Sequence, residues 1–220
     1  MELRLRKNIL KRTCIIIVRH GECKGNREGL FRGRSDFPLN EVGLYQARAL
    51  AREIKILQPT RVFTSPLLRA IQTAKAIRQE CNIEVEEREA LNNIKLGPWE
   101  GKSKDYIAQK YPEQWQVWLN EPEKLIIPGM ESLDAVQERA KRDLDDIIKR
   151  HWGETVIVVS HRAVLKPLIA SCLGVSRPYF WRIHLDTASY SIIHYERKQG
   201  FILVQLNQNK HLSEFISEWQ

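Results

Sequence analysis

Apolar runs alternate along the chain with segments in which apolar residues recur at helical spacing. Residues 15–18 and 155–159 are nearly continuous runs of Ile and Val, which is typical of strands buried on both faces of a parallel sheet. Shorter runs predict strands at 61–63 and 83–85. Helical spacing predicts helices over residues 41–57, 67–80, 131–151 and 162–173. This alternation favours an α/β fold.

The order of the elements predicts a three-layer α/β/α architecture, in which helices cover both faces of a mostly parallel central sheet. Two last strands, at 189–195 and 201–206, are expected to run antiparallel across a short turn. Residues 97–130 interrupt the alternation with a segment rich in Trp and Pro. We expect this insertion to form two short helices and a lid over one edge of the sheet.

A local signal marks the start of the helix over residues 67–80. Ser65 and Thr64 are residue types that cap helices, and Pro66 suits a first helical turn. One of the two hydroxyls is therefore expected to cap this helix.

Length and composition are those of an ordinary globular domain. The 220 residues are 43% hydrophobic and 28% charged, and they contain no apolar run long enough for a membrane span. We expect one domain over residues 1–220, including a basic N-terminal arm (1–12) and a C-terminal tail (207–220). The four cysteines lack CxxC spacing, which fits reduced thiols in a cytoplasmic protein.

The net charge of +8 is shared between the arm and the rest of the chain. Five basic residues and one acidic residue give the arm a charge of +4, so the remainder also carries +4. That excess is modest for a domain whose partner is a small phosphorylated metabolite. No nucleic-acid-binding motif accompanies the arm, so nucleic acid is not an expected partner.

Polar side chains follow three of the predicted strands. Arg19 and His20 come directly after the first strand, Arg69 lies shortly after the second, and His161 follows the strand at 155–159. The carboxyl ends of parallel strands meet at one edge of a sheet, where ligands bind, so these side chains are expected to converge. Two arginines and two histidines there would form a cationic pocket suited to a phosphoryl group in transfer.

A neutral imidazole can attack phosphorus and form a phosphohistidine that water then hydrolyses. The competing interpretation is a metal site built from His20, His161 and a carboxylate. Two neighbouring arginines would repel a divalent cation, so neither a metal nor another cofactor is expected.

The motifs that carry this chemistry resemble those of a known family. They are Val18-Arg19-His20-Gly21-Glu22 followed by Asn26, Ser65-Pro66-Leu67-Leu68-Arg69-Ala70, Gly97-Pro98-Trp99-Glu100-Gly101, Gly129-Met130-Glu131-Ser132 and Val158-Val159-Ser160-His161. Their type and order are similar to the histidine phosphatase superfamily, in its phosphoglycerate-mutase-like branch. The resemblance extends over roughly residues 13 to 195.

The resemblance implies a role for each matching residue. His20 would be the nucleophile that becomes phosphorylated, Arg19 and Arg69 would clamp the phosphate oxygens, and His161 would complete the pocket. Asn26 would contact the phosphate from the loop after the first strand.

Two further arginines are candidates for substrate contact. Arg32 can reach the substrate from the loop, and Arg162 stands where many relatives carry a small residue. Arg162 could bind a carboxylate or a second phosphate on the substrate. For both residues, a solvated surface position is the competing interpretation.

One position departs from the family pattern. The family usually places a proton-donating glutamate where this chain has Asn93. The Asn93 amide can bind the substrate through a hydrogen bond to a leaving oxygen, but it cannot supply a proton at neutral pH. Three explanations remain open: a substrate with an easy leaving group, a protein that binds phosphate compounds with little turnover, or another carboxylate acting in its place, namely Glu100, Glu131 or Asp186.

We predict a metal-independent phosphatase that hydrolyses a small phosphomonoester through a phosphohistidine on His20. The segment 186–194 and the tail resemble metal-independent phosphoserine phosphatases, although Leu96 stands where that subgroup tends to have a histidine. Phosphoglycerate-mutase-type transfer and a phosphate-binding regulatory protein are the alternatives. A homodimer, through Trp181 or the C-terminal segment, is a further hypothesis.

Overall fold

The computed structural model describes residues 12–215, so residues 1–11 of the predicted arm and 216–220 of the predicted tail lie outside it. Six strands form one sheet in the order β3-β2-β4-β1-β5-β6. The strands are β1 (Thr13–Arg19), β2 (Arg61–Thr64), β3 (Glu84–Glu87), β4 (Thr155–Ser160), β5 (Tyr190–Glu196) and β6 (Gly200–Gln208).

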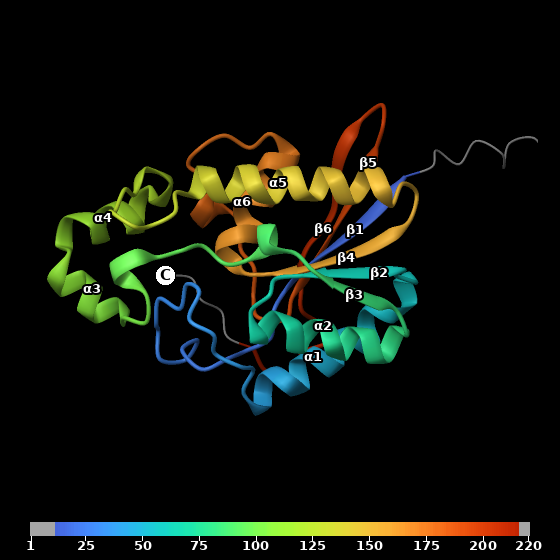
Figure 1. Cartoon of the computed structure of the whole chain (residues 1–220), viewed down its shortest axis with the longest axis horizontal. Coiled ribbons are helices and arrows are strands. Elements are labelled where there is room, and N and C mark those ends of the chain that lie inside the picture. Colours follow the sequence, from blue (N-terminus) through green and yellow to red (C-terminus); the bar gives the residue numbers. More distant parts are fainter. Residues whose placement is uncertain (1–11, 216–220) are drawn as a thin grey trace, which may run out of the picture.

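The predicted mixture of strand directions is confirmed. β1 pairs in parallel with β4, β4 with β2, and β2 with β3. β5 runs antiparallel to β1 on its other side, and β6 runs antiparallel to β5. β1 and β4 therefore lie side by side in the middle of the sheet, and both end at the same edge (Figure 1).

The two faces of the sheet are covered by different helices. α1 (Glu41–Ile54) and α2 (Leu68–Cys81) lie on one face, and α5 (Leu133–Arg150) and α6 (Arg162–Leu173) lie on the other (Figure 1). This is the predicted three-layer arrangement.

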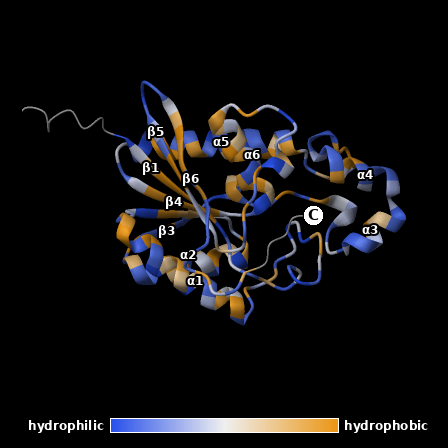
Figure 2. Cartoon of the chain, turned by 180° about the vertical axis from the view of Figure 1, so that it is seen from behind, coloured by the Kyte–Doolittle hydropathy of each residue, from blue (hydrophilic) through white to orange (hydrophobic). Residues whose placement is uncertain are grey.

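Alternate residues of β1 serve the two layers because side chains alternate across a strand. Ile16 and Val18 pack in the core under α1 and α2, whereas Ile15 and Ile17 pack in the core under α5 and α6. All four side chains are buried, which explains the continuous apolar run. The hydrophobic colouring of β1 and β4 in Figure 2 follows from this double burial.

The insertion forms the two predicted short helices, α3 (Lys104–Lys110) and α4 (Pro112–Asn120). They project beyond the three layers at one end of the molecule (Figure 1). Trp118 of α4 packs against Phe31, Phe180 and Trp181, with ring centroids 5.3 to 5.4 Å apart. These aromatic contacts attach the insertion to the body of the fold.

Element boundaries differ from the sequence prediction in several places. The first helix is α-helical only to Ile54 and continues as a 3₁₀ turn at Lys55–Leu57. The long helix begins at Leu133, because the Ser132 hydroxyl accepts a hydrogen bond from the Ala135 amide and caps it. β6 extends to Gln208, so the first residues of the predicted tail belong to the sheet.

The predicted cap of α2 is present only in part, because the Ser65 hydroxyl accepts from the Leu67 amide at 3.3 Å, one residue before the helix begins. α2 begins at Leu68, with Leu67 as its N-cap residue and no capping bond from that side chain. The Leu68 amide instead donates to the carboxylate of Asp36 at 2.7 Å. A residue 32 positions earlier in the chain thus satisfies this helix end, and it ties the loop after β1 to α2.

None of the helices within residues 12–215 combines the length and hydrophobicity that a membrane span requires.

Candidate active site

His20 directly follows β1, and its backbone is fixed on two sides. Its amide donates to the Ser160 carbonyl at 3.1 Å, and its carbonyl accepts from the Ala188 amide at 3.1 Å. The imidazole is buried, and Nδ1 lies 2.7 Å from the Gly21 carbonyl oxygen. A carbonyl can only accept, so Nδ1 carries the proton and the lone pair of the neutral ring is on Nε2.

Burial lowers the pKa of His20 well below its ordinary value, and the positive charges of Arg69, Arg19 and Arg32 lower it further. The ring is therefore neutral near pH 7. A neutral imidazole with its lone pair on Nε2 is the nucleophilic form of histidine.

Two glycines allow the backbone to pack closely around the turn after His20. Thr73 of α2 accepts a hydrogen bond from the Gly21 amide at 3.1 Å. A Cβ added to Gly21 would lie 2.7 Å from the Gly43 carbonyl oxygen, and a Cβ on Gly43 would overlap the Glu22 carbonyl. Only glycine at both positions allows α1 to approach this turn so closely.

His161 follows β4 and lies beside His20, with the ring centroids 5.0 Å apart. Arg69 Nε donates to His161 Nδ1 at 3.3 Å, so His161 carries its proton on Nε2, which lies 2.7 Å from the Ser65 hydroxyl oxygen. Burial, followed by the charge of Arg69, lowers the pKa of His161 well below its ordinary value. The second histidine is thus also neutral.

Arg69 lies in the first turn of α2 and is fully buried. Its two terminal nitrogens donate to the carbonyls of Ser35 and Gly33, each at 2.8 Å. Burial lowers its pKa to about 10, so the guanidinium keeps its charge at neutral pH. Arg69 therefore adds two hydrogen bonds to the Asp36 contact that also joins the loop after β1 to α2.

Arg19 is the last residue of β1, and its side chain is also buried. One terminal nitrogen donates to the Leu185 carbonyl at 2.7 Å. The predicted convergence of Arg19, His20, Arg69 and His161 at one edge of the sheet is therefore present.

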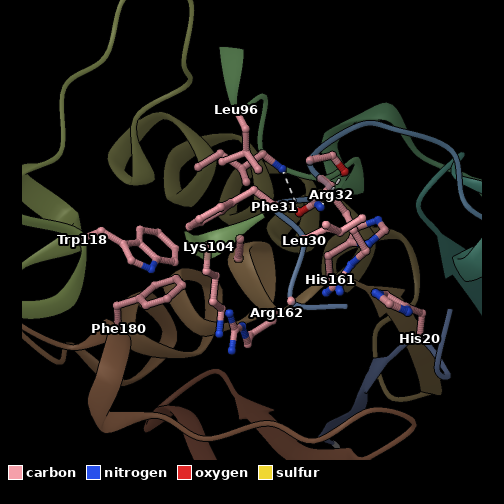
Figure 3. Close-up of a pocket in the computed structure, with 15 residues that line it drawn as sticks. His20, Leu30, Phe31, Arg32, Leu96, Lys104, Trp118, His161, Arg162 and Phe180 are labelled. Carbon is pink, nitrogen blue, oxygen red and sulfur yellow. Dashed lines mark hydrogen bonds between the residues drawn. The ribbon is translucent and has the colours of Figure 1, made fainter. Parts of the chain in front are cut away.

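A pocket opens beside the two histidines and contains about 600 Å³, including its mouth. The 15 described residues that line it are His20, Gly29, Leu30, Phe31, Arg32, Gly33, Asn93, Ile94, Leu96, Lys104, Trp118, His161, Arg162, Ala163 and Phe180. Figure 3 shows the histidines at one side of this pocket and the aromatic pair Trp118 and Phe180 at the other.

The charged residues that line the pocket are all basic. Arg32, Lys104 and Arg162 contribute cations, whereas none of the 15 described lining residues is Asp or Glu. Arg162, for which a solvated surface position was the alternative, is part of the pocket wall, and so is Arg32. Such a wall attracts a substrate that carries more than one negative charge.

Asn93 lines the pocket, and both ends of its amide are engaged by backbone. Nδ2 donates to the Gly33 carbonyl at 2.8 Å, and Oδ1 accepts from the Ile94 amide at 2.9 Å. Gly33 therefore receives hydrogen bonds from both Asn93 and Arg69. The amide holds the loop that also positions Arg69.

Asn26 lies in the same loop and is buried, but it is not among the residues that line the pocket. Its Oδ1 accepts from the Cys23 amide at 2.9 Å and from the Cys23 thiol at 3.2 Å. These contacts shape the turn that follows His20.

The three carboxylates considered as substitutes for a glutamate at position 93 lie elsewhere. Glu131 pairs with Arg139 at 2.6 Å, and Asp186 accepts from Asn207 and Asn209 at 2.8 and 2.9 Å. Glu100 accepts from the Arg34 amide, and its carboxylate lies directly against Gly33 of the pocket wall. None of the three carboxylates is among the described residues that line the pocket.

Sequence reasoning missed Lys104 and Phe180 as pocket residues. Lys104 is the first residue of α3, so it reaches the pocket only because the insertion folds over it. The basic residue at the start of a lid helix was the available signal. Phe180 comes from the loop after α6, and no sequence pattern distinguishes it from an ordinary core residue.

A family model, the histidine phosphatase superfamily (branch 1), matches residues 15–209. The match covers the sheet, both helical layers and the insertion, and the chain belongs to this superfamily. The site agrees with that assignment, because two neutral histidines and buried arginines converge where β1 and β4 end.

Curated relatives indicate the type of enzyme within this superfamily. Phosphoserine phosphatase 1 of Hydrogenobacter thermophilus is 39% identical over 204 residues, which cover 93% of this chain and 96% of the relative. The metal-independent phosphoserine phosphatase of Arabidopsis thaliana is 36% identical over 204 residues, covering 91% and 84%. The protein is therefore a phosphatase.

Among solved structures, Bacillus stearothermophilus YhfR superimposes with a TM-score of 0.86 at 32% identity. The match covers 90% of this chain and 98% of that one. The fold described here is thus that of known members of the superfamily.

Proposed function

We propose that this phosphatase works through a phosphohistidine on His20. The observation that carries the proposal is the Gly21 carbonyl 2.7 Å from Nδ1, which leaves the lone pair of the neutral ring on Nε2. His20 also lines the pocket, so this nitrogen is available to a phosphoryl group. No metal is needed to generate the nucleophile.

The remaining residues stabilise the negative charge of the transferring phosphoryl group. Arg19, Arg69 and Arg32 supply fixed positive charge near His20, and the same charges contribute to the lowered pKa of His20. His161, held by Arg69 and Ser65, lies beside His20 and contributes a second neutral imidazole to the reaction centre.

We expect the enzyme to act in the cytoplasm on a small phosphorylated metabolite. The four cysteines are free thiols, which suits a reducing compartment. Phosphoserine is the first substrate to test, because two relatives are named for it.

The test is release of phosphate from phosphoserine and from p-nitrophenyl phosphate in the presence of EDTA, followed by trapping of the phosphoenzyme. His20→Ala should lower turnover by about 10³-fold or more and abolish the acid-labile phosphoenzyme. His151→Gln is the matched control, because His151 lies after α5 and contacts Glu154 and Phe63 rather than the pocket. A His20→Ala variant that keeps its activity would refute the proposed nucleophile.

A further inference from the structure

The pocket combines three features: an amide at the position where a proton donor is expected, cations beyond the reaction centre, and no carboxylate among its described lining residues. We propose that the site also hydrolyses, and prefers, small organic diphosphates, removing the terminal phosphoryl group while Lys104 and Arg162 hold the phosphate that leaves. This inference rests on the proposed phosphohistidine mechanism.

The first step of that reaction needs no proton. The lone pair of His20 Nε2 forms a bond to the terminal phosphorus, and the bond from this phosphorus to the bridging oxygen breaks. The electron pair stays on the bridging oxygen, which leaves as part of an organic phosphate dianion. Because the second pKa of such a phosphate is about 6, the dianion is stable at neutral pH.

The second step also needs no proton from an acidic side chain. Water attacks the phosphorus of the phosphohistidine, the bond between phosphorus and nitrogen breaks, and its electron pair returns to Nε2. Both protons of the water leave with the inorganic phosphate as H₂PO₄⁻. His20 is restored with its proton still on Nδ1, where the Gly21 carbonyl holds it.

An alkyl phosphomonoester makes a different demand. Its leaving oxygen would depart as an alkoxide, a far stronger base than a phosphate dianion, unless a group donates a proton during the step. Asn93 cannot do so, since its amide donates to the Gly33 carbonyl and has no acidic proton. General acid catalysis typically contributes about 10²–10⁴-fold, and a diphosphate does not require that contribution.

Lys104 and Arg162 account for the second phosphate. They come from two different elements, the first residue of α3 and the first residue of α6, and both line the pocket. In the view of Figure 3 their side chains lie between His20 and the aromatic pair Trp118 and Phe180. An anion attached to the phosphoryl group on His20 would therefore meet two cations.

The rest of the lining is mainly apolar, with Phe31, Ile94, Leu96, Trp118 and Phe180. The organic group of the substrate is accordingly uncharged and small. A substrate whose second anion is separated from the phosphoryl group by an alcohol would reach the same cations but would still need the missing proton.

The experiment compares three probes with the wild-type enzyme in EDTA: isopentyl diphosphate, isopentyl phosphate and p-nitrophenyl phosphate. The first two share one organic group, and the third has a good leaving group but no second anion. We expect kcat/KM for the diphosphate to exceed that for isopentyl phosphate by about 10²-fold or more. Equal or faster turnover of isopentyl phosphate would overturn the inference, as would turnover of p-nitrophenyl phosphate without the diphosphate.

Two variants at position 93 distinguish the effect of an acidic proton from the effect of side-chain size. Asn93→Glu should raise the ratio of kcat on isopentyl phosphate to kcat on the diphosphate by about 10²-fold, because only the monoester gains from a proton donor. The ratio cancels any loss that both substrates share when the hydrogen bond from Asn93 to Gly33 is removed. Asn93→Gln introduces a side chain of nearly the same size as Glu but without an acidic proton, so it should give no gain in kcat on isopentyl phosphate relative to the diphosphate. An equal gain in both variants would overturn the argument about the missing acid.

Variants of the two cations test how the leaving phosphate is held. Lys104→Ala and Arg162→Ala should each raise KM for the diphosphate about tenfold or more, with little change on p-nitrophenyl phosphate. Lys102→Ala, an exposed lysine two residues away that does not line the pocket, is the matched control. Equal losses on both substrates would overturn the assignment of Lys104 and Arg162.

Failure of this inference can be told apart from failure of the proposed function. His20→Ala should abolish turnover of every probe. If it does, while the wild-type enzyme shows no preference for the diphosphate, the phosphohistidine mechanism stands and the substrate inference falls. The comparison of probes requires no variant, so a variant that fails to fold does not prevent the test.

Discussion

Thr73 connects α2 to the turn that carries the nucleophile. Its hydroxyl accepts from the Gly21 amide at 3.1 Å and donates to the Arg69 carbonyl at 2.8 Å, and its side chain is fully buried. Thr73→Val keeps the shape but replaces the hydroxyl with a methyl group. The Gly21 amide then loses this acceptor inside the protein.

The expected cost follows from that loss. Removing the partner of a buried hydrogen-bonding group costs about 1–3 kcal/mol. For a chain of this size, 1 kcal/mol lowers the melting temperature by about 2–4 °C, so we expect a decrease of about 2–12 °C. Since the Gly21 carbonyl orients His20, kcat should also fall, by about tenfold if 1.4 kcal/mol of positioning is lost.

Thermal unfolding and hydrolysis of p-nitrophenyl phosphate measure the two effects. Thr73→Ser keeps the hydroxyl and serves as the control, with both values expected near those of the wild type. A Thr73→Val variant that unfolds within about 0.5 kcal/mol of the wild type and keeps its full kcat would refute the reasoning that links Thr73 to the turn after His20.

Three further predictions follow from the site and its surroundings. The nucleophile is the neutral form of His20, and both burial and the charge of Arg69 lower the pKa of this histidine. Activity should therefore persist above that lowered pKa and fall only as the pH drops through it. An acidic limb of kcat/KM at about pH 6.5 or higher would contradict this prediction. Gly43→Ala places a methyl group against the Glu22 carbonyl and should destabilise the fold by about 1–3 kcal/mol in urea unfolding, whereas unchanged stability would show that α1 can shift freely. Dialysis against EDTA should leave turnover unchanged, because arginines supply the positive charge at the site; loss of activity that is restored by a divalent cation would count against that view.

The strand ends that carry Arg19, His20 and His161 could be predicted because their signals are local. A continuous apolar run fixes each strand, and the side chains at its carboxyl end then lie at one edge of the sheet. The two-sided burial of Ile15 and Ile16 is visible in the same run. The apolar runs and the polar residues directly after them were enough to predict this part of the site.

Contacts between distant segments could not be predicted in the same way. Asp36 caps the first residue of α2 because the loop after β1 folds back onto that helix, whereas the Ser65 hydroxyl contacts His161 and the Leu67 amide. Lys104 enters the pocket only through the packing of the insertion. Such pairings depend on how loops close in three dimensions, and no periodicity in the chain records them.

The burial of Arg19 and Arg69 beside two histidines also has a consequence for handling the protein. Whenever no anion is bound, like charges held out of water oppose folding, and an oxyanion relieves that opposition. Inorganic phosphate, as a reaction product, should therefore act as a stabiliser, contributing about 2.7 kcal/mol at a hundred times its Kd. The melting temperature should accordingly be higher in phosphate buffer than in Tris buffer. The difference between the two values then measures how tightly the enzyme binds its own product.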